Sequence, residues 1–259
     1  MNLDHNSPVV VIGAQGQMGQ RFVSAFIGHG NPVTQLDHPL NMHTLAQAVP
    51  QAALVLLCVP IPAMKSVVNL VAPHLSPQTI LADICSVKIG PLNIMLEATT
   101  TPVVGTHPLF GPQTSAEELR IAITPGRDEL AASQVAVYFR DLEFTPFMTT
   151  AQEHDQAMAY IQGLNFVTTV AYLCASPAQT GLEQFFTPSF ARRMEAATKM
   201  ITEDACLFTT MFEDNPHSLE AVRMFRSYLN VAAGGDLELL SQKALWWWHK
   251  QHDAGEPTS

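Results

Sequence analysis

Residues 8–19 read Pro-Val-Val-Val-Ile-Gly-Ala-Gln-Gly-Gln-Met-Gly and decide the class of fold. The apolar run that ends at Ile12 is typical of a strand that is buried on both faces of a parallel sheet. A glycine-rich turn follows it, and residues 20–28 then carry the apolar spacing of a helix. Open α/β folds bind dinucleotides at such a turn between a strand and a helix.

The turn matches the fingerprint G-x-G-x-x-G with Ala14 at the first glycine position, Gly16 at the second and Gly19 at the third. Gly16 lets the backbone approach a pyrophosphate, and Gly19 lets the helix pack closely on the strand. The first helical turn adds free N–H groups and the positive end of the helix dipole. The predicted cofactor contacts of this turn are Gly13, Ala14, Gln15, Gly16, Gln17 and Met18.

A second strand pattern, residues 32–36, ends in Asp37, which lies 21 residues after Gly16. A carboxylate at this place accepts hydrogen bonds from ribose hydroxyls and repels a 2′-phosphate. The predicted cofactor is therefore NAD, with NADP less favoured. An ordinary strand–turn–helix with spare glycines is the alternative interpretation.

Strand and helix patterns continue to alternate up to about residue 150. The further strands are predicted over residues 52–59, 79–84, 102–106, 121–124 and 142–147, and the further helices over 63–75, 128–140 and a short stretch ending near 98. This alternation predicts an α/β fold in which residues 1–150 form a Rossmann-type, doubly wound, mostly parallel sheet.

Helical patterns alone fill residues 151–259, the predicted substrate-binding and dimerisation domain. The first of them, residues 152–174, is apolar around most of its circumference, and such a helix requires burial on every side. We therefore expect a homodimer formed through this domain. The other helices are predicted over residues 189–212, 218–233 and 236–252, and Trp246-Trp247-Trp248 are interpreted as core and interface packing.

The composition excludes several classes of partner. The formal net charge is −10, whereas nucleic acid and anionic membrane surfaces attract basic patches. No apolar run approaches 18 residues, and the polar amino terminus lacks a basic signal-peptide region. The four cysteines show no C-x-x-C spacing and are expected to be buried thiols. We expect a cytoplasmic protein that has no nucleic-acid or membrane partner.

Residues 105–111, Gly-Thr-His-Pro-Leu-Phe-Gly, follow the fifth predicted strand, at the edge of the sheet where ligands bind. The pKa of a free histidine, about 6.5, lies near working pH, so His107 is a candidate general base. Ser86 follows the neighbouring strand and is expected beside it, near the nicotinamide. The alternative is a loop histidine that only caps a helix or binds a carbonyl.

Taken together, the motifs resemble the TyrA-type prephenate dehydrogenases, which include arogenate and cyclohexadienyl dehydrogenases. The matching segments are Ile12–Gly19, Val59-Pro60-Ile61, Asp83 with Ser86-Val87-Lys88, Gly105–Gly111, and Glu153-His154-Asp155 leading to Tyr160-Ile161-Gln162. The resemblance implies NAD-dependent oxidative decarboxylation of prephenate to 4-hydroxyphenylpyruvate in tyrosine biosynthesis. It implies that His107 accepts the proton of the ring hydroxyl, that Ser86 is its hydrogen-bond partner, and that residues 59–61 contact the cofactor.

The resemblance also implies an arginine that holds the anionic side chain of the substrate. Arg193 fits that pattern best, with Arg192 in reserve, and a guanidinium suits a carboxylate because it binds as a fork. Phe166, beside Asn165, stands where many members of the family carry a substrate-contacting histidine. This departure leaves arogenate and 4-amino-4-deoxyprephenate open as alternative substrates.

Two other functions compete with this interpretation. A β-hydroxyacid or imine-reducing dehydrogenase would place a catalytic lysine in the helical domain, where Lys199 is the candidate. A non-catalytic NAD-binding sensor could share the fold. We interpret His154 as structural, since adjacent side chains on a helix diverge, and no metal site is expected.

Overall fold

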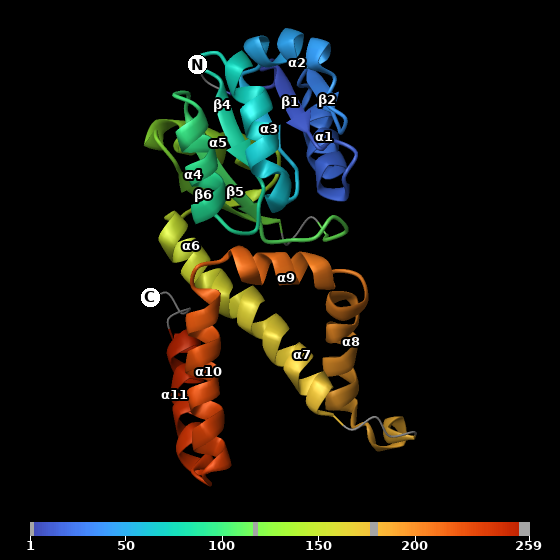
Figure 1. Cartoon of the computed structure of the whole chain (residues 1–259), viewed down its shortest axis with the longest axis vertical. Helices are drawn as coiled ribbons and strands as arrows, with labels where there is room; N and C mark the ends of the chain where they lie inside the picture. Colours follow the sequence, from blue (N-terminus) through green and yellow to red (C-terminus); the bar gives the residue numbers. More distant parts are fainter. Residues whose placement is uncertain (1–2, 116–118, 177–180, 254–259) are drawn as a thin grey trace.

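The computed structural model describes residues 3–115, 119–176 and 181–253. A seven-stranded sheet covered by helices forms one half of the molecule, and a group of helices forms the other (Figure 1). The strands lie in the order β2-β1-β3-β4-β5-β6-β7. Their bounds are β1 Val9–Ile12, β2 Val33–Leu36, β3 Leu54–Leu57, β4 Ile80–Asp83, β5 Val103–Pro108, β6 Arg120–Pro125 and β7 Thr145–Met148. The predicted Rossmann-type architecture is thus confirmed.

Strand β5 differs from its prediction in a way that changes the site. The strands from β2 to β5 pair in parallel, but β6 pairs with β5 in the antiparallel sense. The ladder therefore continues past Thr106, and His107 lies opposite Ala122 within the strand. The predicted strand end at residue 106 is wrong because β6 supplies backbone partners beyond it. His107 is consequently held by a strand and not by a loop.

Helices cover both faces of the sheet. Successive side chains of a strand point to opposite faces, so Val9 and Val11 pack on one side, and Val10 and Ile12 on the other. The first side is covered by α1 Gln17–His29 and α5 Glu129–Asp141, and the second by α2 Met42–Ala48, α3 Met64–Val71 and α4 Ile89–Ala98. Helix α2 has no counterpart among the predicted helices. Short 3-10 turns are η1 Val49–Gln51, η2 Ile61–Ala63, η3 Ala72–His74 and η6 Leu182–Phe185.

A capping box starts the helical half. The Thr150 hydroxyl accepts a hydrogen bond from the backbone N–H of Glu153, whose carboxylate accepts one from the backbone N–H of Thr150. The cap coincides with the predicted domain boundary at residues 150 and 151, which stays a prediction. One continuous helix follows, made of α6 Ala151–Met158, a π-helical segment η5 Ala159–Leu164, and α7 Asn165–Ala175.

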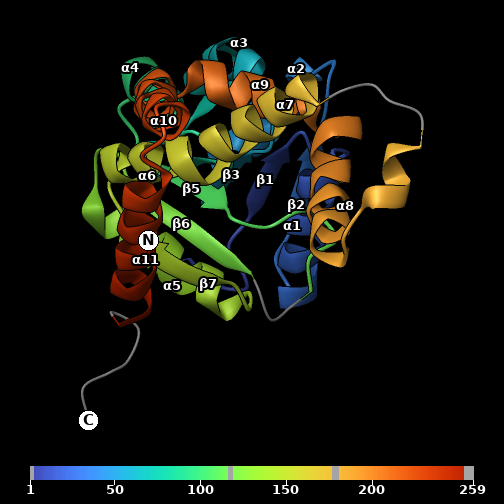
Figure 2. The same ribbon diagram turned by 90° about the horizontal axis from the view of Figure 1, so that it is seen from below.

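The single helix predicted over residues 189–212 is in fact two helices, α8 Pro188–Thr202 and α9 Ala205–Asp214. The backbone N–H groups of Glu203 and Asp204 both donate to the carbonyl of Lys199, which ends α8. Asp204 lies just before α9, at a helix boundary that aspartate favours over a helix interior. Helix α9 therefore runs beneath the sheet half while α8 turns away from it (Figures 1 and 2).

Helices α10 Ser218–Ala233 and α11 Leu237–Asp253 lie side by side at the end of the chain (Figure 1). The side chains of Trp246, Trp247 and Trp248 are 55–60% exposed. Their predicted place in the core is therefore wrong for the single protomer, and packing against a partner subunit stays a prediction. Two thiols also depart from expectation, because Cys174 and Cys206 are exposed.

The continuous helix Ala151–Ala175 is long and apolar enough to cross a membrane by length and composition, with a mean hydropathy of 1.2 in its most apolar window. Only 28% of that window is buried, and Tyr160 and Ile161 are 49% and 63% exposed. The core helix of a soluble protein can pass the same test of length and composition. Its exposed apolar surface agrees with the expected covering by a partner subunit.

Candidate active site

In the glycine-rich turn, backbone segments approach each other so closely that a side chain would not fit between them. Gly13 has φ of +84°, and a Cβ there would lie 2.2 Å from the carbonyl oxygen of Cys58. A Cβ on Gly19 would lie 2.0 Å from the carbonyl oxygen of Gly13. Gly16 precedes α1, and no side chain of the described residues caps the first turn of that helix. Its N–H groups are therefore free to bind an anion such as a pyrophosphate.

A cavity of about 540 Å³ adjoins this turn at the carboxyl ends of β1, β2 and β3. Asp37 lies at its edge, where Oδ2 accepts a hydrogen bond of 2.7 Å from the backbone N–H of Gln15. Ala14 is buried and Ile61 packs on the core instead of lining the cavity. The lining residues are Ile12, Gly13, Gly16, Asp37, His38, Leu40, Cys58, Val59, Pro60, Ala63, Ser66, Val67 and Leu70. This glycine cradle with a carboxylate at its edge fits the adenosine half of a dinucleotide.

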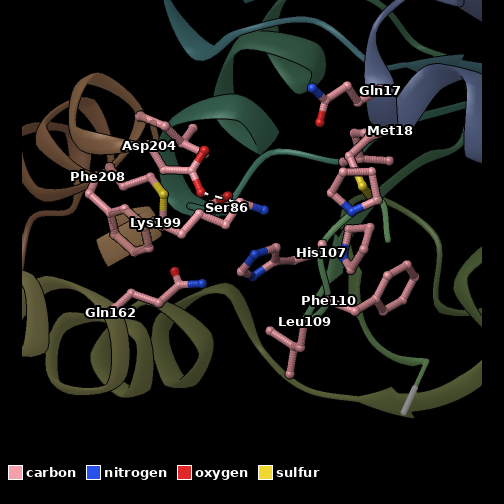
Figure 3. Close-up of a pocket in the computed structure, with 16 residues that line it drawn as sticks. Gln17, Met18, Ser86, His107, Leu109, Phe110, Gln162, Lys199, Asp204 and Phe208 are labelled. Carbon is pink, nitrogen blue, oxygen red and sulfur yellow. Dashed lines mark ion pairs between the residues drawn. The ribbon is translucent and has the colours of Figure 1, made fainter. Parts of the chain in front are cut away.

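A second cavity, of about 450 Å³, lies between the sheet and α9 (Figure 3). Gln17 and Met18 belong to its wall, so it adjoins the first cavity at the amino end of α1. The remaining lining residues are Ile84, Ser86, His107, Pro108, Leu109, Phe110, Gly111, Pro112, Gln162, Lys199, Asp204, Leu207, Phe208 and Met211. His107 and Ser86 thus meet in one cavity next to the dinucleotide cradle.

His107 is the first member of a hydrogen-bonded chain. Its Nδ1 lies 2.8 Å from Nε2 of His154, and Nδ1 of His154 lies 2.8 Å from Oδ1 of Asp155. A carboxylate oxygen only accepts, so His154 carries its proton on Nδ1 and offers Nε2 as the acceptor. His107 then donates from Nδ1. Its Nε2 is left with a free lone pair, which is the form that a general base requires.

The surroundings of His107 keep its ring neutral. Burial lowers the pKa of His107 well below its usual value, and the neighbouring His154 and the Lys88 ammonium act in the same direction. A charged imidazolium loses its hydration in such a place. The ring is therefore ready to accept a proton at neutral pH.

Asp155 joins the helical half to the sheet half. Its carboxylate accepts hydrogen bonds from the backbone N–H groups of Lys88, at 2.7 Å, and Ile89, at 2.9 Å, at the start of α4. Asn215 binds the carbonyl of Asp155 from the other side. The sequence interpretation of His154 as structural stays a prediction, and the structure adds that His154 is hydrogen-bonded both to His107 and to Asp155. The sequence contains the triplet Glu153-His154-Asp155, which is part of the resemblance. That the ring of His154 contacts His107 depends on how the helix docks on the sheet, and the sequence does not show this.

A buried ion pair supports the strand under His107. Lys88 is completely buried, and its Nζ lies 2.7 Å from Oδ2 of Asp83 and 2.6 Å from the carbonyl oxygen of Thr106. A Cβ on Gly105 would lie 3.1 Å from the Lys88 side chain, so the glycine makes room for it. The lysine therefore fixes the strand immediately before His107.

Some of the residues predicted to contact the substrate line the cavity, and others do not. Ser86 lines the cavity, but among the described residues the ring of His107 bonds to His154 and not to the Ser86 hydroxyl. Arg193 lies over the ring of Tyr172, 4.2 Å from its centroid, and neither it nor Arg192 lines the cavity. The described cavity wall instead contains Lys199, which sequence reasoning assigned only to a competing function.

Phe166 lies one layer behind the cavity. It is buried and stacks on Phe208, a lining residue, with ring centroids 5.5 Å apart. Asn165 is exposed and does not line the cavity. Phe166 thus contacts the cavity wall through Phe208 and does not itself line the cavity.

Known proteins match both the sequence and this architecture. Residues 36–125 match the family model described as prephenate dehydrogenase, nucleotide-binding domain. The chain is thus similar to the prephenate dehydrogenases. It is 26% identical to the T-protein of Haemophilus influenzae over 86% of this chain and 60% of that protein, and 29% identical to the T-protein of Enterobacter agglomerans over 84% and 59%. It therefore spans about three fifths of the length of these curated relatives.

A solved structure shares the fold over nearly the whole chain. The prephenate dehydrogenase of A. aeolicus, in complex with hydroxyphenyl propionate and NAD+, superposes with a TM-score of 0.77 at 16% identity. The match covers 98% of this chain and 99% of that one. The sheet and the helical region are thus arranged as in a prephenate dehydrogenase.

Proposed function

We propose that the chain is an NAD-dependent dehydrogenase that converts prephenate to 4-hydroxyphenylpyruvate in tyrosine biosynthesis. The observation that carries the proposal is the hydrogen bond from His107 to His154, itself bound to Asp155. It leaves Nε2 of His107 as a base in a cavity that adjoins a dinucleotide cradle. A base beside a hydride acceptor is what the oxidation of an alcohol needs.

The proposed reaction assigns a balanced role to each group. His107 Nε2 accepts the proton of the hydroxyl on ring carbon C4. The bound NAD supplies the acceptor for the hydride that leaves C4. The bond between C1 and its carboxylate breaks, and carbon dioxide departs as the electron pair of that bond makes the ring aromatic. The C4 oxygen then takes back the proton from His107, which restores the free base and gives the phenol. Because aromatisation drives the step, the protein has mainly to orient the ring and hold one base.

The residues proposed to bind NAD belong to the glycine-rich turn and to the segments that follow strands β2 and β3. The N–H groups at the start of α1 would bind the pyrophosphate, and the Asp37 carboxylate would favour the free ribose hydroxyls of NAD over the phosphate of NADP. The exposed apolar faces of α7 and α11 support a homodimer formed through the helical region. A cytoplasmic location accords with these ligands.

An anionic substrate needs a cation, and Lys199 is the candidate in the described cavity wall. Its Nζ lies 3.8 Å from Oδ2 of Asp204, a loose and half-exposed pair that can open to bind a carboxylate. Arg193 and Arg192 stay predictions for the same role. Lys199 also keeps one competing function open, that of a dehydrogenase with a catalytic lysine.

The decisive experiment measures NADH formation by the purified chain with prephenate, arogenate and 4-amino-4-deoxyprephenate side by side. The highest kcat/KM is expected with prephenate. A higher kcat/KM with arogenate or 4-amino-4-deoxyprephenate would support the proposed reaction type but would identify a different substrate. Binding of NAD without turnover of any of the three would contradict the proposal and favour a non-catalytic sensor. Reduction of an imine or a β-keto acid alone would favour the lysine-dependent dehydrogenase.

A further inference from the structure

Gln162 lies at an irregular point of the long helix. It belongs to the π-helical segment Ala159–Leu164, and such segments occur often at functional sites. Its neighbour Gly163 packs tightly, because a Cβ there would lie 3.2 Å from Oγ of Ser218 and 3.5 Å from the ring of Phe212. The helix thereby packs against α9 and α10, and Gln162 faces the cavity (Figure 3).

The amide of Gln162 extends toward His107 across the cavity (Figure 3). Its Oε1 is buried and has no hydrogen-bond partner among the described residues. A buried polar atom without a partner costs about 1–3 kcal/mol. Because Gln162 lines the cavity, its unpaired Oε1 is available to a molecule bound there.

The neighbours of Gln162 define what it can bind. Leu207, Phe208 and Met211 give the α9 side of the cavity an apolar wall suited to a ring. His107, Ser86 and Gln162 supply polar groups around that ring, while Lys199 and Asp204 are more exposed. A glutamine amide both donates and accepts, so it matches a hydroxyl, an amine or a carboxylate carried on a ring carbon.

We propose that Gln162 is a substrate-binding residue that determines specificity for the polar substituents of the ring held against His107. The inference rests on the proposed function, since it concerns the same substrate. Gln162 takes no part in proton transfer. It orients the ring so that the group to be oxidised meets Nε2 of His107.

The test replaces Gln162 by methionine, which has a similar length and no hydrogen-bonding amide. Gln162→Met should lower kcat/KM for the ring substrate roughly 10–100-fold, the range for loss of one or two hydrogen bonds. The Kd for NAD should stay unchanged, and the Tm should stay equal or rise because the orphaned acceptor is gone. Gln152→Met is the matched control, since Gln152 lies on the same helix, is exposed, and bonds only to His217 among the described residues.

Two results would overturn the proposal. A fall in Tm for Gln162→Met beyond that of Gln152→Met would show a structural role, and this readout does not depend on the identity of the substrate. Unchanged binding of 4-hydroxyphenylpyruvate, measured by calorimetry with wild type and variant, would show that the amide does not contact the ring. Failure of the proposed function is recognised separately, because the wild type then neither turns over nor binds the ring compounds.

Discussion

The ring of His107 is hydrogen-bonded, at 2.8 Å between Nδ1 and Nε2, to the ring of His154. His107 belongs to strand β5, whereas His154 belongs to the helix that opens the helical half. Asp155 completes the link, because it binds both His154 and the start of α4. The ring of His107 therefore has this hydrogen-bond partner only when the helix is docked on the sheet.

Replacement of His107 by asparagine removes the proposed base while keeping a polar side chain. We expect turnover to fall roughly 10²–10⁴-fold, the usual contribution of general base catalysis. The Kd for NAD should change little, because the cradle lies on other strands. Steady-state kinetics and NAD titration check both parts, and near-normal turnover would remove His107 from the mechanism.

Replacement of His154 by leucine removes the acceptor that orients His107. We expect kcat to fall roughly 10–100-fold, because the ring of His107 can then adopt the wrong tautomer. The KM for NAD should stay the same. His43→Leu, at an exposed histidine of α2, is the control. An unchanged kcat for His154→Leu would show that strand β5 alone orients the base.

The lowered pKa of His107 has two consequences for pH. The acid limb of kcat/KM should lie below pH 6.5, since the free base persists there. Unfolding lets the ring bind a proton below its ordinary pKa of about 6.5, so the unfolded state takes up protons that the native state excludes. The contribution of His107 to stability is complete above that pH and is lost as the pH falls. Urea unfolding of wild type and His107→Asn between pH 5 and about 8 measures the difference; parallel curves would contradict this.

The buried pair of Lys88 and Asp83 gives a prediction for stability. Lys88→Met leaves the Asp83 carboxylate buried and unpaired, so the free energy of unfolding should fall by about 3–5 kcal/mol. The double variant Lys88→Met with Asp83→Leu removes both charges and should recover much of the loss. Denaturant unfolding checks this, and a double variant no more stable than the single one would contradict the argument.

Asp37 offers a test of cofactor choice. Asp37→Asn removes the charge that repels a 2′-phosphate and keeps an oxygen for the N–H of Gln15. The ratio of kcat/KM for NAD to that for NADP should fall roughly tenfold or more. An unchanged ratio would mean that another residue recognises the ribose.

The cation that binds the substrate can be identified by a matched pair. Lys199→Met should raise the KM for the anionic substrate roughly tenfold or more, while Lys199→Arg should retain most of the affinity. Arg193→Met should have a small effect if its role is to stack on Tyr172. A larger rise in KM for Arg193→Met than for Lys199→Met would identify Arg193 as the residue that binds the substrate. Loss of turnover in Lys199→Arg with unchanged KM would indicate a catalytic lysine.

Much of the fold followed from local patterns. The apolar run before Gly13 and the alternation of strands and helices predicted the sheet, because a fully buried parallel strand and an amphipathic helix each carry their own periodicity. Local patterns could not predict where strand β5 ends, because its last residues pair with β6, an antiparallel strand that is distant in the sequence. The break at Asp204 was missed because one boundary residue inside a long helical pattern is a weak local signal.

The sequence by itself determined the dinucleotide turn, Asp37 at the end of β2, and the chemical identity of His107 and Ser86. Only the tertiary structure decided the partners of those residues. The tertiary structure makes His154 the acceptor for His107 and places Lys199 and Gln162 in the cavity lining. It also places Arg193 on the ring of Tyr172. The physical reason is that backbone periodicity is local. A hydrogen bond between residues 107 and 154, in contrast, depends on how a helix docks on a sheet.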